Sequence, residues 1–482
     1  MTSYFTNSLV PTSVSKFINT TGTLKSFIYR TPKSGDVQWA NGGSIGSSVG
    51  ETVTIFSGTS DSSGNVFIVG QFLGGLTFGS IALNSVSGSY SSGFILKLDS
   101  SGTAIWGATI GSSGGNCAFR GVSCDSTSNI YVTGFFISTA SIFSSNGVSF
   151  GSLTSTGVAD VITVKYDVSG GVLWRAKAAT LVSLKSDIGY GIICDNSSAY
   201  VTGQFTGTTS STSITFYNSN DTTYGTTLSG NLGNIFLVKY DSTGFVQWLT
   251  GAGSNGNDGV NAITLNPTNG DLYITGFVSS TSICFFTGTG ITLPASGGQG
   301  MLAKTNSAGV WQWAAQLSAS IGACTADSSG NFYAVVNSTN LYKYDTSGTY
   351  QWSVSGTSIS MSSVKVVSGY IYITGSYSGT ATFYNASGVA FGTTLASIGS
   401  NDVFVAKYDT AGNVIWVMRA GSTGSDTASI VSLSPNYLNI SGNYGGNMYF
   451  YYVDGTPSVP VNPLALFNPS SGGNIFTAKF LL

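Results

Sequence analysis

VFVAKYDTAGNVIW (403–416) places two apolar segments on either side of Asp-Thr-Ala-Gly, and the same phrase recurs along the chain. The other full copies are FILKLDSSGTAIW (94–106), VITVKYDVSGGVLW (161–174) and IFLVKYDSTGFVQW (235–248). Because Asp can bond the backbone that follows it and Gly tolerates positive φ, each copy predicts two strands joined by a tight turn.

The tryptophan that ends this phrase marks a long repeat. Seven of the eight tryptophans occupy this position: Trp39, Trp106, Trp174, Trp248, Trp313, Trp352 and Trp416. They lie 64 to 74 residues apart, except for 39 residues between Trp313 and Trp352. We therefore expect seven units, and their constant place within a strand predicts tryptophans that pack in the core rather than a sugar-binding platform.

Two further apolar stretches precede the phrase in each unit. Examples are TVTIFSGTSD (52–61), followed by GNVFIVGQF (64–72), and their alternating β-branched and aromatic residues are typical of strands. Four antiparallel strands repeated seven times, with no helical period, predict an all-β fold, a seven-bladed β-propeller. A parallel β-helix would have a period nearer 20 to 30 residues, and stacked sandwiches would not explain the constant phrase.

The two ends of the chain each carry part of one unit. NIFTAKFLL (474–482) lacks the turn and the tryptophan strand, which KSFIYRTPKSGDVQW (25–39) contains. We expect Val37, Gln38 and Trp39 to pair with the segment from Phe476 to Phe480 and close the ring. The predicted domain covers residues 25–482, and residues 1–24 form an N-terminal arm.

Most units carry an extra segment between the second and third strands, such as TSITFYNSNDTTYGTTLSG (212–230). Its own β pattern predicts an inserted hairpin. NFYAVVNSTNLYKYD (331–345) passes almost directly between the two strands, so the fifth unit should lack the hairpin and the other six should have it.

DSSGNVFIVGQF (61–72) and FVAKYDTAGNVIW (404–416) closely resemble the SBBP β-propeller repeat, and the resemblance extends over about residues 25 to 482. It supports the fold strongly and the function weakly. Members of that family occur on bacterial surface and secreted proteins and among proteins of large DNA viruses, generally without an assigned enzymatic activity. Unlike the secreted bacterial members, this sequence shows no export signal or anchoring domain, which favours a component of a virion or other particle.

Charged residues make up only 7% of the chain, and the net charge is −2. Disorder is excluded by 41% hydrophobic and 13% aromatic residues, and 17 scattered basic residues do not suit nucleic-acid binding. The N-terminus has no standard signal peptide, and no apolar run is long enough for a membrane span. Cytoplasmic synthesis is expected, followed by residence there, incorporation into a virion or release to a surface.

The residue types offer little for catalysis. The chain has no histidine, a single glutamate and five cysteines without Cys-x-x-Cys spacing, so we expect buried free thiols, no zinc site and no cofactor. Most aspartates are turn residues: Asp99, Asp167, Asp241, Asp345 and Asp409. The lysines two positions before them are expected to pair with them locally: Lys97, Lys165, Lys239, Lys343 and Lys407.

One acidic series has a different place, between each tryptophan strand and the next unit. Its members are Glu51, Asp187, Asp258 and Asp426, with Asn116 at the matching position. An incomplete ring of carboxylates could hold a cation through oxygen ligands, or the same groups could cap loop amides. Both interpretations stay open from sequence alone.

Aromatic residues of the variable segments are the predicted interaction residues. They are Tyr217, Phe285, Phe286, Tyr384, Tyr449, Phe450, Tyr451 and Tyr452. The resulting functional hypothesis is a non-catalytic structural or interaction propeller that contacts protein neighbours or copies of itself. The alternatives are a glycan-binding module and a propeller-type lyase or hydrolase.

Overall fold

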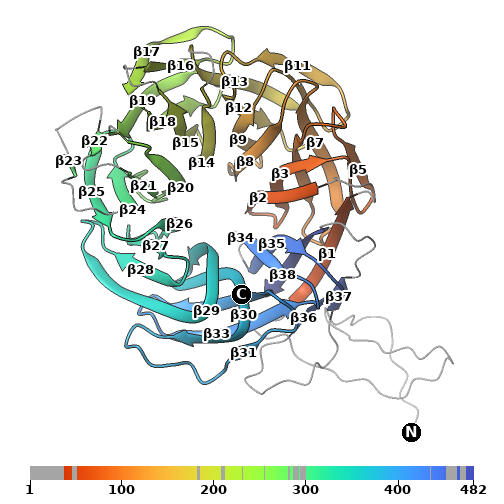
Figure 1. Cartoon of the computed structure of the whole chain (residues 1–482), viewed down its shortest axis with the longest axis vertical. Coiled ribbons are helices and arrows are strands. Elements are labelled where there is room, and N and C mark those ends of the chain that lie inside the picture. Colours follow the sequence, from red (N-terminus) through yellow and green to blue (C-terminus); the bar gives the residue numbers. More distant parts are fainter. Residues whose placement is uncertain are drawn as a thin grey trace, which may run out of the picture.

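A computed structural model describes residues 37–45, 52–181, 185–207, 212–230, 232–254, 256–279, 283–285, 292–293, 300–434, 436–451, 464–466 and 474–481. Their strands form six hydrogen-bonded sheets that stand around a central opening (Figure 1). This radial arrangement is that of a β-propeller and confirms the prediction of an all-β repeat fold. Within the described ranges, the chain contains no helix with the length and hydropathy needed to cross a membrane.

Two sets of strands lie nearest the opening and pair antiparallel with each other. The innermost strands are β2 (Thr52–Ser60), β8 (Cys117–Cys124), β14 (Ile188–Cys194), β20 (Gly259–Leu265), β26 (Ile321–Ala326), the later part of β29 (Tyr350–Val367) and β34 (Thr427–Ser434). The second strands are β3 (Val66–Leu73), β9 (Ile130–Phe136), β15 (Ser198–Thr206), β21 (Leu272–Phe277), β27 (Phe332–Val336), the first part of β30 (Tyr370–Tyr384) and β35 (Tyr437–Tyr444).

The third and fourth strands continue each sheet outward. The third strands are β6 (Ser92–Leu98), β12 (Asp160–Tyr166), β18 (Gly233–Asp241), β24 (Gly300–Thr305), β28 (Asn340–Tyr344), β32 (Asp402–Asp409) and β38 (Asn474–Leu481). The fourth strands are β7 (Ala104–Ser112), β13 (Val172–Thr180), β19 (Val246–Gly253), β25 (Trp311–Leu317), the first part of β29, β33 (Val414–Gly421) and β1 (Val37–Ile45).

The inserted hairpins add two strands to a sheet, but to the sheet of the preceding unit. They are β4 (Gly75–Phe78) with β5 (Ile81–Asn84), β10 (Thr139–Phe143) with β11 (Ser149–Thr154), β16 (Thr212–Tyr217) with β17 (Thr223–Gly230), β22 (Ile283–Phe285) with β23 (Thr292–Leu293), the end of β30 with β31 (Leu395–Ala396), and β36 (Met448–Phe450) with β37 (Leu464–Leu466). For example, β10 lies between β9 and β12 in sequence yet pairs with β7. The sheet β20-β21-β24-β25 keeps four strands because the following unit carries no hairpin.

Two long strands join neighbouring units into one ten-stranded sheet. Residues 350–355 of β29 pair with β28, and its later residues pair with β30. β30 in turn runs from the second-strand position into the hairpin that pairs with Ser355 to Thr357 of β29. The boundary between two sequence units therefore does not always coincide with a break between sheets.

The N- and C-terminal strands lie side by side. In β1, Val37 faces Phe480 and Trp39 faces Lys479, and the pairing continues to Ser44 opposite Asn474. β38 also pairs with β35 on its other side. The C-terminal strand is thus flanked by backbone from both ends of the chain.

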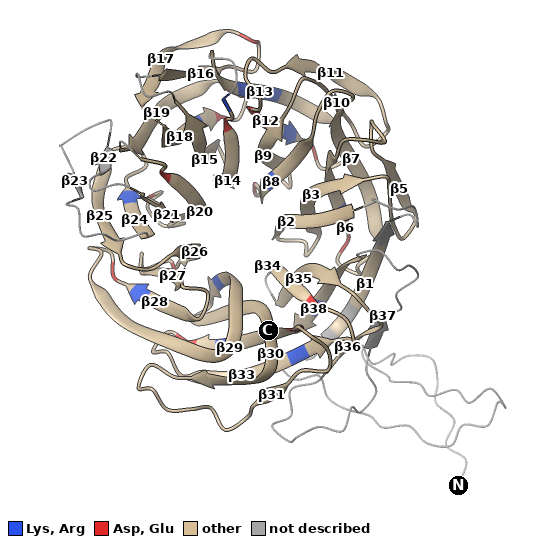
Figure 2. Cartoon of the chain, in the orientation of Figure 1, with Lys and Arg blue, Asp and Glu red and all other residues tan. Residues whose placement is uncertain are grey.

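The apolar core lies between adjacent sheets. One cluster combines Phe67 and Val69 of β3 with Val132 of β9 and Trp106 of β7. Trp106, Trp174 and Trp416 are buried, as expected from their place within strands. Three others are partly buried and pack against the core: Trp248, Trp313 and Trp352. Alternating side chains of each strand contact the sheet on either side, which is why the third strands are buried on both faces. In Figure 2, where Lys and Arg are blue and Asp and Glu are red, charged residues are sparse along the described ribbon.

The repeated lysine and tryptophan bind the next unit rather than their own turn. We call the turns at 99–102, 167–170, 241–244, 306–309, 345–348 and 409–412 the outer turns. Lys165 Nζ and Trp174 Nε1 both donate to the carbonyl oxygen of Ser242 in the outer turn of the following unit, at 3.1 and 3.0 Å. The expected local Lys–Asp pairing is therefore replaced by a contact between units.

The same contact recurs around the molecule. The other donor and acceptor pairs are Lys97 and Trp106 with Val168, Lys304 and Trp313 with Thr346, Lys343 with Thr410, and Lys479 with Ser100. Each of these lysines also lies over an aromatic ring of its own unit, as Lys165 does over Tyr131 at 4.8 Å from the ring centroid. Burial lowers the pKa of the Lys165 ammonium, and the carbonyl and the ring face compensate for part of its lost hydration.

In four outer turns the final glycine allows the preceding unit's tryptophan to approach closely: Gly170, Gly244, Gly309 and Gly348. Gly244 has a φ of +87°, and a Cβ at this position would lie 2.8 Å from the Trp174 ring. Asp241 accepts the backbone N–H groups of Thr243 and Phe245, which fixes the turn. Although burial opposes ionisation, these bonds and that from the Thr243 hydroxyl keep the pKa of Asp241 below its usual value.

We predict that Gly244→Ala lowers the free energy of unfolding by about 2 to 5 kcal/mol, because it combines positive-φ strain with a clash against Trp174. Gly388→Ala is the matched control, since Gly388 has a φ of +75° and a Cβ added there would meet open space. It should cost about 1 to 2 kcal/mol from strain alone. Midpoints of chemical unfolding measure the difference, and equal losses would contradict the proposed tryptophan contact.

Lys165→Met is expected to destabilise the chain by about 1 to 3 kcal/mol, because it removes the bond to the next unit and keeps most of the apolar stem. Lys239 provides the control at the same repeat position. It lies over Tyr200, but it makes no hydrogen bond within the described residues. Lys239→Met should therefore cost less in the same unfolding measurement, and a cost equal to that of Lys165→Met would show that the bond is unimportant.

Candidate functional site

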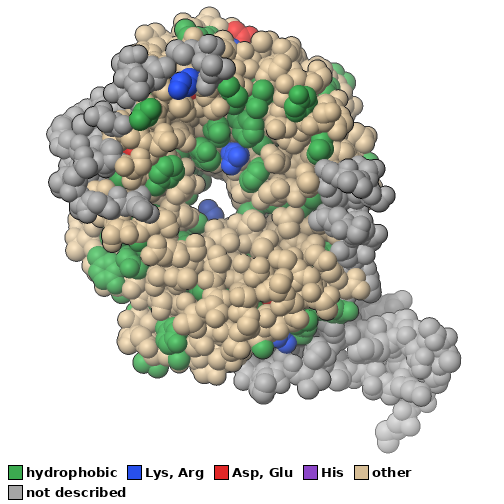
Figure 3. All heavy atoms as spheres, viewed as in Figure 1, with side chains coloured by type: hydrophobic (Ala, Val, Ile, Leu, Met, Phe, Trp, Pro, Cys, Tyr) green, Lys and Arg blue, Asp and Glu red, His purple; other side chains and the backbone are tan. Residues whose placement is uncertain are grey.

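An axial cavity of about 360 Å³ occupies the centre of the molecule. Its lining comes from seven innermost strands, β2, β8, β14, β20, β26, β29 and β34. Figure 3 shows the opening between the side chains, with basic groups visible in and beside it. A cavity of this size is at the lower end of the range for small-molecule sites.

The innermost strands share a β-bulge at one position, and the bulged residues line this cavity. The register against the second strand shifts around Phe56, Arg120, Tyr190, Asn261, Ser362 and Ser429, and in β26 around Gly322 and Ala323. All of these residues belong to the cavity wall. A bulge redirects the extra residue of the strand. Each of the seven strands therefore directs a bulged residue toward the axis, and the residue type differs from strand to strand.

Arg120 is the bulged residue of β8, and aromatic rings surround it. Its guanidinium carbon lies 4.8 Å from the ring centroid of Phe56, 5.2 Å from that of Tyr190 and 5.5 Å from that of Phe135. Phe56 and Tyr190 are the bulged residues of the two neighbouring units. The Nε atom is buried and has no hydrogen-bond partner, and burial lowers the pKa of the guanidinium.

Lys365 of β29 is the other charged residue of the wall. No described residue forms a hydrogen bond or an ion pair with its ammonium group, and burial lowers its pKa. The nearby Cys324 thiol cannot balance the charge, because burial raises the pKa of that thiol to about 12. Sequence reasoning missed Arg120 and Lys365, although charges inside otherwise apolar innermost strands were a visible signal in AFRGVS (118–123) and SSVKVV (362–367).

The described members of the predicted acidic series lie at the crossings between units, where their carboxylates accept backbone N–H groups. Asp187 accepts from Thr180 at 2.5 Å and from Thr206 at 3.2 Å, and so joins the end of one unit to the second strand of the next. Asp426 likewise accepts from the backbone of Ser422 and Gly445.

The remaining members of the series make similar contacts. Asp258 accepts from the Ser254 hydroxyl and the Ser279 N–H, and Asn116 accepts from the Ser91 N–H. No group of three or more His, Cys, Asp or Glu side chains in the described ranges is placed to hold a metal ion. Glu51 lies outside the described residues.

Two further carboxylates at the same end were not anticipated. Asp160 and Asp402 begin third strands, and each is fully buried. Asp160 accepts the backbone N–H of Thr156, and Asp402 accepts that of Ile398, which closes the loop after the inserted hairpin. Burial raises the pKa of both carboxyl groups.

The predicted interaction aromatics occupy different environments. Tyr217, Tyr384, Tyr449 and Tyr451 are partly buried on or beside the hairpin strands. Phe450 packs in the core against Phe476 and is only 1% exposed, so it faces the interior rather than a partner. The side chain of Phe285, and all of Phe286 and Tyr452, lie outside the described part of the structure.

Exposed apolar side chains follow the outer turns, one to three residues after the turn glycine. One large hydrophobic residue follows each turn within five residues, and these six form what we call the apolar turn set: Ile105, Leu173, Phe245, Val310, Tyr350 and Ile415. Their exposed fractions lie between 38 and 50%. Because every unit runs in the same direction, the outer turns all lie at one end of the molecule, opposite the acidic crossings.

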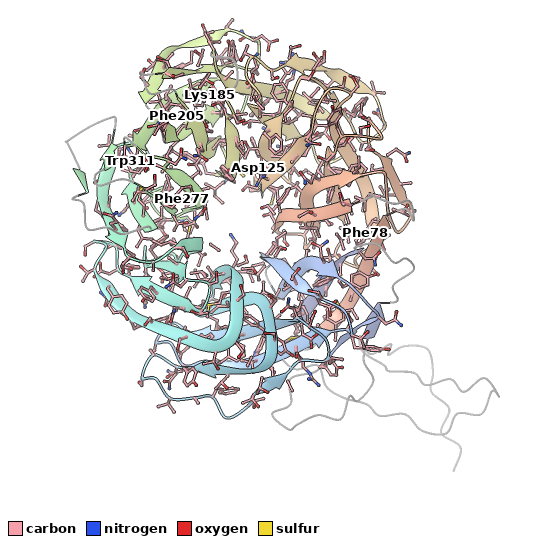
Figure 4. The ribbon with its side chains drawn as sticks, viewed as in Figure 1. Phe78, Asp125, Lys185, Phe205, Phe277 and Trp311 are labelled. Atoms are coloured by element: carbon pink, nitrogen blue, oxygen red, sulfur yellow. The ribbon has the colours of Figure 1, made fainter. Side chains whose placement is uncertain are left out.

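Figure 4 shows the radial order of several side chains. Asp125 and Phe277 lie toward the central opening, whereas Phe78 and Trp311 lie farther out. Asp125 accepts the N–H groups of Thr127 and Asn129 in the turn that follows β8. Cys117, Cys124, Cys194 and Cys324 are free thiols; the side chain of Cys284 is not described.

Comparisons with known proteins add a distant relative. The chain is 28% identical over 200 residues to an uncharacterised WD repeat-containing protein of Acanthamoeba polyphaga mimivirus. The match covers 38% of this chain and only 14% of the viral protein. No family model matches the chain, so its likeness to the SBBP repeat remains a resemblance.

Solved structures show only weak overall likeness. The Dos1 propeller is 8% identical, covers 90% of this chain and 93% of its own, and has a TM-score of 0.43. A europium-containing methanol dehydrogenase is 10% identical, covers 84% and 90%, and has a TM-score of 0.39. These scores are too low to support any functional comparison.

We predict a pH dependence of stability from Asp187. Burial raises the pKa of its carboxyl group to about 7, whereas an unfolded chain releases this proton near pH 4. Between about pH 4 and 7 the folded chain binds a proton that the unfolded chain has lost, so the free energy of unfolding should fall as pH rises through this window.

Asp187→Asn should remove about 1 to 3 kcal/mol of the difference in unfolding free energy between pH 5 and pH 8. Asp195→Asn is the control, because hydrogen bonds from Ser197 and Tyr200 outweigh burial and keep the pKa of Asp195 low. Urea unfolding at the two pH values measures the effect. An unchanged pH dependence in Asp187→Asn would exclude Asp187 as its source.

Proposed function

We propose that this chain is a non-catalytic interaction propeller and serves as a building block of a viral or other particle. In this proposal residues 25–482 form one seven-bladed domain, closed by pairing of β38 with β1, and residues 1–24 form an arm. The functional part of this proposal rests on the apolar turn set, which lies at one end of a weakly charged molecule.

Contacts between the first and last units support the closed seven-bladed ring. Lys479 of β38 donates to the Ser100 carbonyl in the first outer turn at 2.7 Å. The hydroxyls of Ser60 in β2 and Ser432 in β34 lie 2.7 Å apart, and Asn439 donates to Ser60. The axial cavity, with its wall of seven innermost strands, agrees with the same arrangement.

The apolar turn set supports binding to protein surfaces. The polar groups of the turns beside these six side chains already form hydrogen bonds within the protein. For example, Asp241 accepts the backbone N–H groups of Thr243 and Phe245. Apolar anchors with a polar surround are the usual composition of the centre of a protein interface. With a net charge of −2, neighbouring copies would repel each other little.

The viral relative supports the particle setting in a limited way. Its matched region is short compared with its full length, so its own activity and partners do not transfer to this chain. Weak charge and regular exposed edges suit dense packing of many copies. A glycan-binding or catalytic role would require a site for which the described residues offer no specific support.

We predict that Phe245→Ser combined with Tyr350→Ser releases the native protein from its assembly, because two of the six anchors are lost. Sedimentation of extracts from the natural source, followed by detection of the chain, measures the fraction in large particles. The expected change is about tenfold or more in apparent affinity, if each buried anchor contributes about 1 kcal/mol or more.

Leu181→Ser combined with Ile398→Ser is the matched control, since these exposed residues lie at the opposite end. The control should remain in the particle fraction. A wild-type chain that sediments as a free monomer would refute the building-block proposal, and saturable binding of that monomer on a glycan array would favour the alternative.

A further inference from the structure

The axial cavity has a charge character opposite to that of the whole chain. Its wall contains two cations, Arg120 and Lys365, and no Asp or Glu, although the net charge of the protein is −2. A concave site with one sign of charge raises the local concentration of oppositely charged ligands. The cavity is therefore the place in the described structure best suited to an anion.

Arg120 presents unused hydrogen-bond donors. Phe56, Tyr190 and Phe135 contact its guanidinium through their ring faces, which accept no conventional N–H···O bond. Its Nε is buried without a partner, and no described residue forms an ion pair with it. The two terminal nitrogens, not the buried Nε, are therefore the adjacent donors that this guanidinium offers to a carboxylate or phosphate.

Lys365 offers a second positive charge at another level of the same cavity. Ser362 of β29 occupies the bulge position that Arg120 occupies in β8, and Lys365 lies three residues beyond it. Three residues of strand correspond to about 10 Å along the axis. The two residues therefore lie at different levels of the cavity, and an elongated ligand fits them better than a single spherical ion.

We propose that the axial cavity binds a small elongated ligand with two oxyanionic groups, one held by Arg120 and the other by Lys365. The oxyanions are phosphate or carboxylate groups, which share the required charge and acceptor geometry. Such a ligand neutralises both cations and satisfies their unused donors. The volume of about 360 Å³ limits it to a small molecule.

The test is calorimetric titration of the full chain with pyrophosphate and, separately, with glutarate, at constant ionic strength. At least one probe should show saturable one-site binding. Pyrophosphate alone would identify a phosphate-class ligand, and glutarate alone a dicarboxylate. Arg120→Gln and Lys365→Met should each weaken binding about ten- to a hundredfold, as expected for loss of one charged hydrogen bond.

Arg175→Gln is the control, because Arg175 forms an ion pair with Asp221 outside the cavity and its loss should leave binding unchanged. Lys365→Met also guards against a folding defect in Arg120→Gln, since the Lys365 ammonium bonds no described residue. Absence of saturable binding of both probes to the wild-type chain would refute the proposal. Binding that persists unchanged in Lys365→Met would refute it as well.

Discussion

In five of the six outer turns, one backbone carbonyl links successive units of this molecule. In the best-formed examples, such as Ser242, it accepts a lysine ammonium and an indole N–H from the unit before it. The Asp carboxylate fixes the turn that presents this carbonyl, and the final glycine leaves room for the tryptophan ring. The four repeated residues Lys, Asp, Gly and Trp thus form one interaction between units rather than four separate features of a hairpin.

Between the third and fourth units, part of this interaction is missing. Asn306 replaces the usual Asp in that outer turn, and the buried Trp248 Nε1 has no hydrogen-bond partner. Lys239 retains its aromatic contact with Tyr200. The apolar core between the sheets still joins these units, so the loss of one polar contact is tolerated in a structure that repeats it elsewhere.

The strands and hairpins were predictable because their signals are local. Alternation identifies a strand, and Asp-x-x-Gly identifies a turn, within a dozen residues. The partner of Lys165 was not predictable in this way, since the nearest opposite charge in sequence is Asp167 while the observed acceptor is Ser242. The insertion was also recognised, but its pairing with the preceding sheet depends on which exposed edge lies beside it in space.

The candidate site was harder to predict from the sequence than the fold. A bulge is defined by the register of two paired strands, so the common position of Phe56, Arg120 and Tyr190 emerges only when each innermost strand is set against its partner. The sequence order of the acidic crossing residues indicates only that they follow the tryptophan strands. Their hydrogen bonds to backbone amides depend on loops whose conformations have no simple pattern.

The displaced hairpins also constrain how such a chain can change over time. Each six-stranded sheet combines strands of two repeats: in three of them the edge comes from the next repeat along the gene, and in β34-β35-β38-β1-β4-β5 it comes from the first repeat. Exchange of a single repeat by recombination would alter two neighbouring sheets at once. The four-stranded sheet β20-β21-β24-β25 illustrates this coupling, because the following repeat has no hairpin and so leaves this sheet without two outer strands.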